Sequence, residues 1–183
     1  MIPNIKKNSV KNAIKYADYA IGELIKKAKK EAYYKDTVFV IVADHNVRVY
    51  GDDMVPVNMF HIPGLILGEG ITPKVYNNIA TQADVLATAI DLTGVSDKMP
   101  IMGHSIFNDK KRNLALMQFN DRYAFMVDNI VTVIRPKMKP MTFIYKNNHL
   151  VKTKENIELE KDALAFLLVL DYVYKNQLYK SLK

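Results

Sequence analysis

One run of seven residues constrains the fold of this chain more than any other feature. Residues 37–43 read Thr-Val-Phe-Val-Ile-Val-Ala, with β-branched and aromatic side chains and no polar alternation. Such a run predicts a fully buried central strand. Residues 9–32 precede it with apolar side chains every three to four positions, which predicts a helix packed on one face of a sheet. A helix followed by a buried strand indicates an α/β fold with a parallel sheet.

Two polar residues, Asp44 and His45, follow this strand directly. In open α/β sheets, ligands bind at the carboxyl ends of the strands. A carboxylate and an imidazole side by side can ligate one divalent cation such as Zn²⁺ or Mn²⁺. Alternatively, Asp44 is a turn or capping residue. The polar segment that follows ends in another histidine, His61, which favours a site.

The chain continues with a second short strand over residues 64–67 and a second helix over residues 81–93. Thr81 can cap this helix, with Asp84 in its first turn and Gly94 just after its end. An extended segment is expected over residues 100–107. These elements complete the predicted α/β core, which we assign to residues 1–110.

From residue 114 the hydrophobic period changes to two. Strand patterns separated by Asn and Asp turn signals predict an antiparallel meander, over residues 114–119, 123–127, 130–134 and 141–145. A last helix is expected over residues 155–182. Residues 111–183 are therefore expected to form a small antiparallel subdomain with a C-terminal helix.

Charge is distributed unevenly over the 183 residues, whose net charge is +7. Residues 1–35 carry nine lysines and three acids, whereas residues 36–136, which hold Asp44 and His45, have a net charge of −3. This distribution argues against a nucleic-acid partner. These lysines either form a solvated helix face or attract the chain to an anionic membrane surface. The absence of cysteine excludes disulfides and thiolate metal sites, and no apolar run approaches the ~20 residues of a membrane span.

Four ordered segments together resemble a known family. They are preceded by a helical run over residues 12–22 and comprise residues 36–45, 60–67, 79–94 and 102–107. These segments are similar to the C-terminal part of a sulfatase-type domain, in particular that of the lipoteichoic acid synthase and phosphoglycerol transferase branch of the alkaline phosphatase superfamily. The resemblance covers roughly residues 9–110. It implies a partial alkaline-phosphatase-like sheet with flanking helices.

The resemblance implies metal-dependent phosphoryl or sulfuryl transfer. Asp44 and His45 match two ligands of a divalent metal, which would be Mn²⁺, Zn²⁺, Mg²⁺ or Ca²⁺. His61 matches a histidine that contacts the substrate phosphate or a second metal. Arg48 could bind a phosphate or simply be exposed to solvent. The family's Thr, Ser or formylglycine nucleophile is expected upstream of Met1, so we expect half of a metal site and no activity from this chain alone.

For the intact protein, the resemblance implies a membrane-tethered enzyme in the periplasm or at the cell surface. Its substrate would be a phosphate ester, such as that of an anionic lipid headgroup. One alternative is a true sulfatase acting on sulfate esters. Another is a non-catalytic module that binds anionic surfaces through the lysine-rich helix. The expected partner is the missing N-terminal half of the domain, and a sheet edge left open without it makes self-association plausible.

Overall fold

The computed structural model describes residues 8–46, 51–95, 101–108, 110 and 112–180. The chain divides into two compact units. The first comprises Met1–Phe39 with Leu67–Pro73, and the second comprises Val40–Ile66 with Lys74–Lys183. Each unit is described here by itself. The domain boundary expected near residue 110 stays a prediction.

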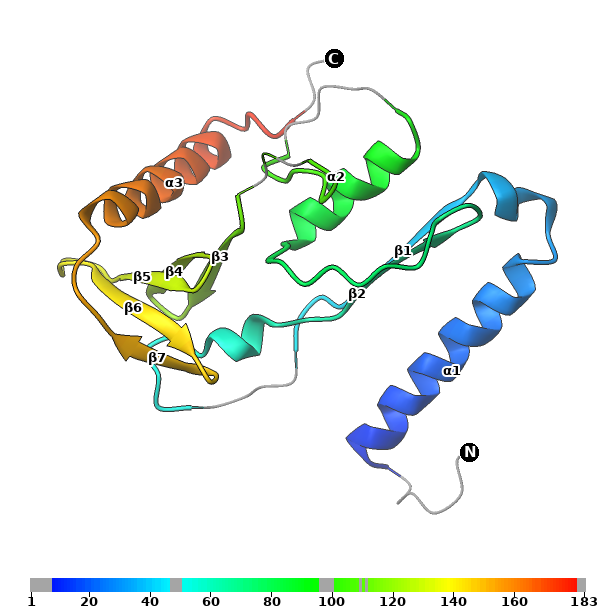
Figure 1. Ribbon diagram of the computed structural model, residues 1–183, viewed down its shortest axis with the longest axis horizontal. Coiled ribbons are helices and arrows are strands. Elements are labelled where there is room, and N and C mark those ends of the chain that lie inside the picture. The colour runs from blue at the N-terminus through cyan, green and yellow to red at the C-terminus, as the bar shows by residue number, and fades with distance from the viewer. Residues whose placement is uncertain (1–7, 47–50, 96–100, 109, 111, 181–183) are drawn as a thin grey trace. The chain divides into compact units, whose positions relative to one another are not determined.

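The first unit contains the amphipathic helix α1, Val10–Ala28, and the short 3₁₀ helix η1, Ala32–Asp36 (Figure 1). The Ser9 hydroxyl caps α1 by accepting a hydrogen bond from the Asn12 amide at 3.3 Å. The apolar stripe predicted to face a sheet is mostly solvent-exposed, because Val10 and Ile14 are 63% and 58% accessible. Ala28, at 1%, is the buried residue of the helix. The prediction of a packed apolar face is therefore wrong for the first turns of α1.

Strands β1, Val38–Val42, and β2, Gly64–Gly68, form a two-stranded sheet (Figure 1). Val40 and Val42 on β1 are 40% and 39% exposed, and Leu65 on β2 is 50% exposed. The strand was correctly predicted from its β-branched run, but the expectation that it is fully buried is wrong. In a sheet of two strands, each strand has a single neighbour, so part of its apolar surface stays in water.

Helix α2, Gln82–Leu92, has the N-terminus predicted for it. The Thr81 hydroxyl accepts a hydrogen bond from the Asp84 amide, and the buried Asp84 carboxylate accepts one from the Thr81 amide at 2.8 Å. This reciprocal pair is a capping box. Gly94 follows the helix with a φ of +69°, as expected for a residue just past a C-terminus.

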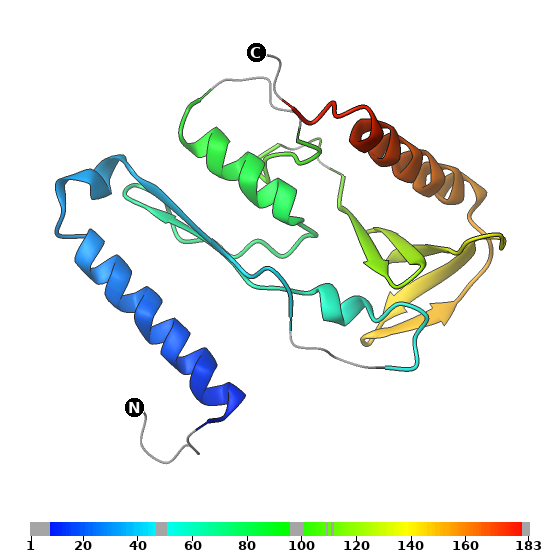
Figure 2. The same ribbon diagram turned by 180° about the vertical axis from the view of Figure 1, so that it is seen from behind.

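The extended segment 101–108 runs beside α2 and is attached to it by buried side chains (Figure 2). Asp84 accepts a hydrogen bond from the His104 amide at 2.8 Å, and the Thr88 hydroxyl accepts one from the Ile106 amide at 3.0 Å. Gly103 lies so close to the helix that a Cβ at this position would collide with the Ala83 carbonyl group. Only glycine fits this contact.

The second unit also contains a five-stranded antiparallel meander in which every strand pairs with its neighbour in sequence. Left-handed Asn and Asp residues occupy its tight turns, at Asn120, Asp128, Asn147 and Asn148. The strands are β3 Leu114–Phe119, β4 Arg122–Val127, β5 Ile130–Ile134, β6 Met141–Lys146 and β7 His149–Lys152. The short strand β7 was not predicted, although its turn was.

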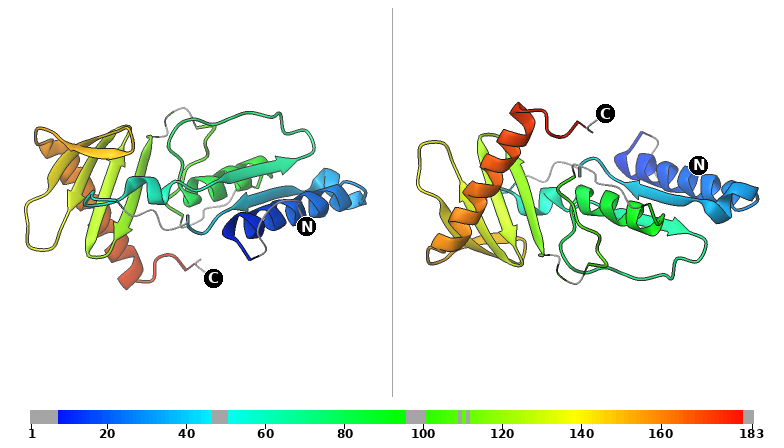
Figure 3. Two further views of the ribbon diagram at one scale, coloured as in Figure 1. Left: turned by 90° about the horizontal axis from the view of Figure 1, so that it is seen from below. Right: turned by 90° about the horizontal axis from the view of Figure 1, so that it is seen from above.

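The two faces of the meander bury different partners. Helix α3, Ile157–Lys175, crosses one face, where Leu159, Ala163 and Phe166 pack around Phe125 (Figure 3). The opposite face packs against Val55 and Val57 from the segment before β2. Helix α3 ends earlier than predicted, because the Asn176 side chain hydrogen-bonds the Tyr172 carbonyl and Gln177 takes a left-handed conformation.

A cross-strand threonine pair under α3 offers a test of this packing. Thr132 and Thr142 face each other across β5 and β6, and both are buried. The Thr142 hydroxyl donates to Glu160 and accepts from the Asn156 amide, both at 3.1 Å, whereas the Thr132 hydroxyl has no partner among the described residues. We expect Thr132→Val to raise the free energy of unfolding by about 1 kcal/mol and Thr142→Val to lower it by about 1–3 kcal/mol. Urea unfolding of both variants measures this, and equal effects would contradict the assignment.

Gly103 provides a second prediction. Gly103→Ala should lower the free energy of unfolding by about 1–3 kcal/mol, because the added methyl group collides with the Ala83 backbone. The matched control is Gly22→Ala in α1, where an added Cβ meets nothing within 4 Å. There the substitution should stabilise by about 0.5–1 kcal/mol through helix propensity. Thermal unfolding of the two variants gives the comparison, and a neutral Gly103→Ala would disprove the steric requirement.

Candidate metal centre

Asp44 and His45 lie immediately after β1, in a turn whose backbone is held from two sides. The Ala43 amide donates to the Pro63 carbonyl at 3.1 Å, continuing the contact between the two strands. From the first residue of α2, the Gln82 side-chain amide donates to the Ala43 carbonyl at 2.8 Å and to the Asp44 carbonyl at 3.3 Å. The position of this turn is therefore fixed by both β2 and α2.

The two side chains of the pair point into solvent, with Asp44 88% and His45 83% accessible. One Asp44 oxygen, Oδ1, accepts the His45 backbone amide at 2.8 Å. The other oxygen, Oδ2, lies 3.7 Å from His45 Nε2. On the far side of the ring, Nδ1 lies 3.0 Å from the Asn46 carbonyl oxygen. A carbonyl can only accept, so Nδ1 is the donor in this contact, and Nε2 is the ring nitrogen that faces the Asp44 carboxylate.

The Asp44 carboxylate and the His45 ring are arranged so that they could supply two of the ligands of a divalent cation. Cations such as Zn²⁺ lie about 2.0–2.2 Å from imidazole nitrogen and carboxylate oxygen, and the separation of 3.7 Å between Asp44 Oδ2 and His45 Nε2 lets one ion contact both. The Nδ1 contact with Asn46 is the outer-shell bond that metal-bound histidines commonly make. Within the described ranges, no third His, Cys, Asp or Glu joins the pair. The assignment of Asp44 and His45 as metal ligands stays a prediction.

His61 and Arg48 were the other predicted site residues. The Asn46 side-chain amide donates to the His61 carbonyl at 2.8 Å, so the His61 backbone adjoins the Asp44–His45 turn. His61 is exposed at the end of the 3₁₀ helix η2, Val57–Phe60. Arg48 lies outside the described residues. The substrate-binding roles assigned to these two residues stay predictions.

Sequence reasoning missed the residues that hold the turn in place. Gln82 hydrogen-bonds the Ala43 carbonyl just before the turn. Asn46, just after the turn, hydrogen-bonds the His61 carbonyl. Neither residue belongs to a recognisable motif. For Gln82, the available signal was its place: a long amide side chain in the first turn of a helix can reach across to the end of a neighbouring strand.

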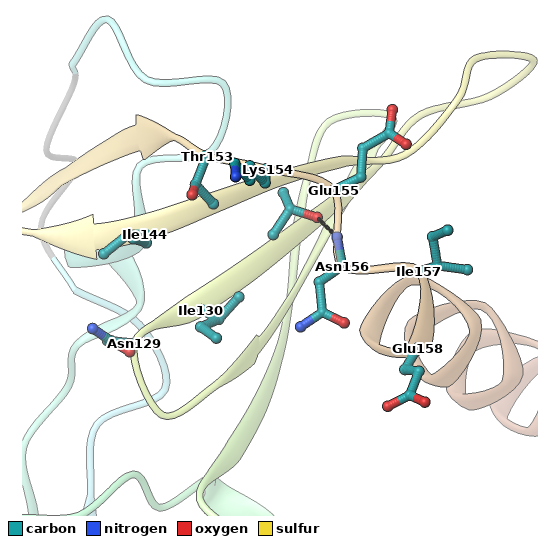
Figure 4. Close-up of a pocket in the computed structure, with 10 residues that line it drawn as sticks. Asn129, Ile130, Ile144, Thr153, Lys154, Glu155, Asn156, Ile157 and Glu158 are labelled. Carbon is teal, nitrogen blue, oxygen red and sulfur yellow. Dashed lines mark hydrogen bonds between the residues drawn. The ribbon is translucent and has the colours of Figure 1, made fainter.

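A separate pocket of about 500 Å³ opens beside the N-terminus of α3 (Figure 4). It is lined by side chains of both charges and by apolar ones, among them Ile130, Lys154 and Glu158. Asn156 and Thr142, both of which line it, are joined by a hydrogen bond from the Asn156 amide to the Thr142 hydroxyl. Neither Asp44, His45 nor His61 lines it, so this pocket is not the predicted metal site.

The described helices show no membrane-crossing segment. None of them combines sufficient length with sufficient apolar character to span a bilayer.

Comparisons with known proteins agree with the family resemblance at a coarser level. Residues 6–95, which include Asp44, His45 and His61, match the family model named Sulfatase. The whole chain aligns with a crystal structure of a protein in the alkaline phosphatase superfamily from Vibrio parahaemolyticus, with a TM-score of 0.88 and 32% sequence identity. The chain spans about half of that protein, 47% of its length. The α/β fold is thereby confirmed. Residues 6–95 are thus similar to the Sulfatase family model, within a fold shared with an alkaline phosphatase superfamily protein.

Proposed function

We propose that the chain is part of a metal-dependent enzyme that cleaves or transfers phosphate esters, in the phosphoglycerol transferase branch of the superfamily. The observation that carries this proposal is the Asp44–His45 pair. It combines a carboxylate oxygen with an imidazole nitrogen 3.7 Å away, at the end of a strand in the segment that matches the Sulfatase family model. Their chemistry is that of ligands for Mn²⁺ or Zn²⁺.

In this proposal Asp44 and His45 would hold one divalent ion between them. The chemistry that such an ion would supply there is polarisation of a phosphoryl oxygen and activation of a nucleophile. The chain's own residues supply the geometry. Asn46 holds the His45 ring through its carbonyl group, and Gln82 holds the backbone of the turn. Ligands held in place by such outer contacts lose little freedom when the ion binds.

His61 is the second part of the proposal. Its backbone is tied to Asn46, next to the predicted ligands, and its side chain is exposed. A protonated histidine ring can donate hydrogen bonds to a phosphate oxygen. We assign His61 to binding the substrate phosphate. Arg48 is assigned to the same task.

Sulfate esters are the second candidate substrate class, because the matched family model is that of sulfatases. Sulfate and phosphate esters share tetrahedral geometry, but a phosphate monoester carries one charge more. An intact membrane-tethered protein acting outside the cytoplasm on anionic lipid headgroups is the wider setting that we propose. The nucleophile and further metal ligands would come from the other half of the domain.

Metal binding by the chain itself is the first test. Mn²⁺ broadens NMR signals of nuclei close to it, and the chain has four histidines whose ring signals can be followed separately. We expect His45 to broaden at the lowest Mn²⁺ concentration. Asp44→Asn and His45→Gln should each weaken Mn²⁺ binding by about tenfold or more.

The control for this experiment removes the same two residue types elsewhere. Asp171 forms an exposed ion pair with Lys175, and the His104 ring is exposed. The double variant Asp171→Asn/His104→Gln should bind Mn²⁺ as the wild type does. If the wild type and the Asp44 variant bind Mn²⁺ equally, the metal assignment fails.

Ester preference is tested on the full-length gene product. A phosphodiester and a sulfate ester of p-nitrophenol are compared at saturating Mn²⁺. We expect hydrolysis of the phosphodiester, with kcat/KM reduced by more than about 100-fold in Asp44→Asn, since a direct metal ligand matters more than its outer-shell partners. Faster turnover of the sulfate ester would favour the sulfatase alternative. Turnover of either ester that is indifferent to Asp44→Asn would refute both.

A further inference from the structure

The segment between the Asp44–His45 turn and β2 has an unusual anchor. Residues 53–60, named here the docked segment, insert side chains into the face of the meander opposite α3. Val55 is fully buried and Val57 is 8% exposed, and they share a core cluster with Met117, Val131 and Phe143. Burial of apolar side chains such as these is a main source of stability in folded proteins. The docked segment is therefore fixed on the sheet by a hydrophobic core.

Two polar contacts from different strands reinforce this anchor. Arg122 on β4 donates a hydrogen bond from Nη1 to the Met54 carbonyl at 2.8 Å. His149 on β7 lies with Nδ1 3.4 Å from the Asp53 carboxylate, which is only 18% exposed. On β6, burial and, secondarily, the Asp53 charge raise the pKa of the Tyr145 phenol. Strands β4 and β7 thus contact the start of the docked segment, and the Asp53 charge influences a side chain on β6.

The other end of the docked segment meets the predicted metal ligands. It leads into His61, whose carbonyl accepts the Asn46 side chain at 2.8 Å. Asn46 in turn provides the carbonyl that contacts the His45 ring. A chain of contacts therefore runs from Arg122 through the docked segment and His61 to Asn46 and His45. Every residue in this chain of contacts lies in the second compact unit.

We propose that the C-terminal meander positions the predicted metal site, and that Arg122 is a positioning residue for it. The sheet holds the docked segment, the docked segment holds His61, and the His61 carbonyl holds Asn46 beside His45. A site must keep its groups within about 0.5 Å of the working geometry, which requires such support from rigid elements. This inference rests on the proposed function only where it treats Asp44 and His45 as metal ligands. The physical coupling stands without it.

The test compares two arginine variants without any metal. Arg122→Met removes the hydrogen bond to Met54, and Arg112→Met is the control. Arg112 forms an ion pair with Asp162 on α3 at 3.2 Å. The readouts are amide hydrogen exchange and the NMR signals of the Asn46 side-chain amide and the His45 and His61 rings.

We expect Arg122→Met to speed exchange of the Met59 and His61 amides, which hydrogen-bond within the docked segment and at its end, by about tenfold or more. The Asn46 side-chain amide should move toward its free position, while amides of β4 and β5 keep their protection. Arg122→Lys, which retains a donor, should restore much of the wild-type pattern. Arg112→Met should leave the Asn46, His45 and His61 signals unchanged.

Two results would overturn the proposal. In the first, Arg122→Met leaves the Asn46 and His61 signals unchanged, so that the sheet does not hold them. In the second, the docked segment and β4–β5 lose protection equally, so that Arg122 acts only on global stability. If Arg122→Met does not fold, Asp53→Asn carries the same comparison, because it removes an ion pair but no core contact. Failure of Mn²⁺ binding would leave these metal-free readouts intact, so the two proposals fail separately.

Discussion

The buried carboxylate of Asp84 is the interaction on which the centre of this structure depends. Its oxygens accept hydrogen bonds from the Thr81 amide, the Thr81 hydroxyl and the His104 amide. A buried carboxylate is costly unless its lone pairs are satisfied, and here three donors satisfy them. By starting α2 at this point, Asp84 also sets the place of Gln82, which holds the end of β1. Asp84 thereby joins the helix start to the segment 101–108, and Gln82 joins the same helix start to the Asp44–His45 turn.

Much of the local structure could be predicted because its determinants are local. The capping residues of α2 and the left-handed Asn and Asp residues of the hairpins act within a few positions of themselves. Burial could not be predicted in the same way. The β-branched run of β1 and the apolar stripe of α1 are typical of buried elements, yet Val40 and Val10 are exposed. A sequence pattern shows which surface can be buried, and the presence of a partner decides whether it is.

The candidate site likewise contains residues that could be predicted from the sequence and residues that could not. Asp44 and His45 could be identified because a strand end and a family pattern both point to them. The residues that support them could not, because their partners are distant in the chain. Gln82 reaches a carbonyl 39 positions away, and Arg122 reaches one 68 positions away. Such contacts depend on tertiary packing, and no spacing rule encodes them.

The order of the elements along the chain has a consequence for synthesis. A meander whose strands pair only with sequence neighbours forms from local contacts. Its core, however, includes Val55 and Val57, which leave the ribosome long before Phe143 completes the face that buries them. At about 5–20 residues per second, the intervening chain takes several seconds to make. During those seconds the docked segment has no sheet to bind, so the turn that carries Asp44 and His45 reaches its final support only when the C-terminal strands are finished.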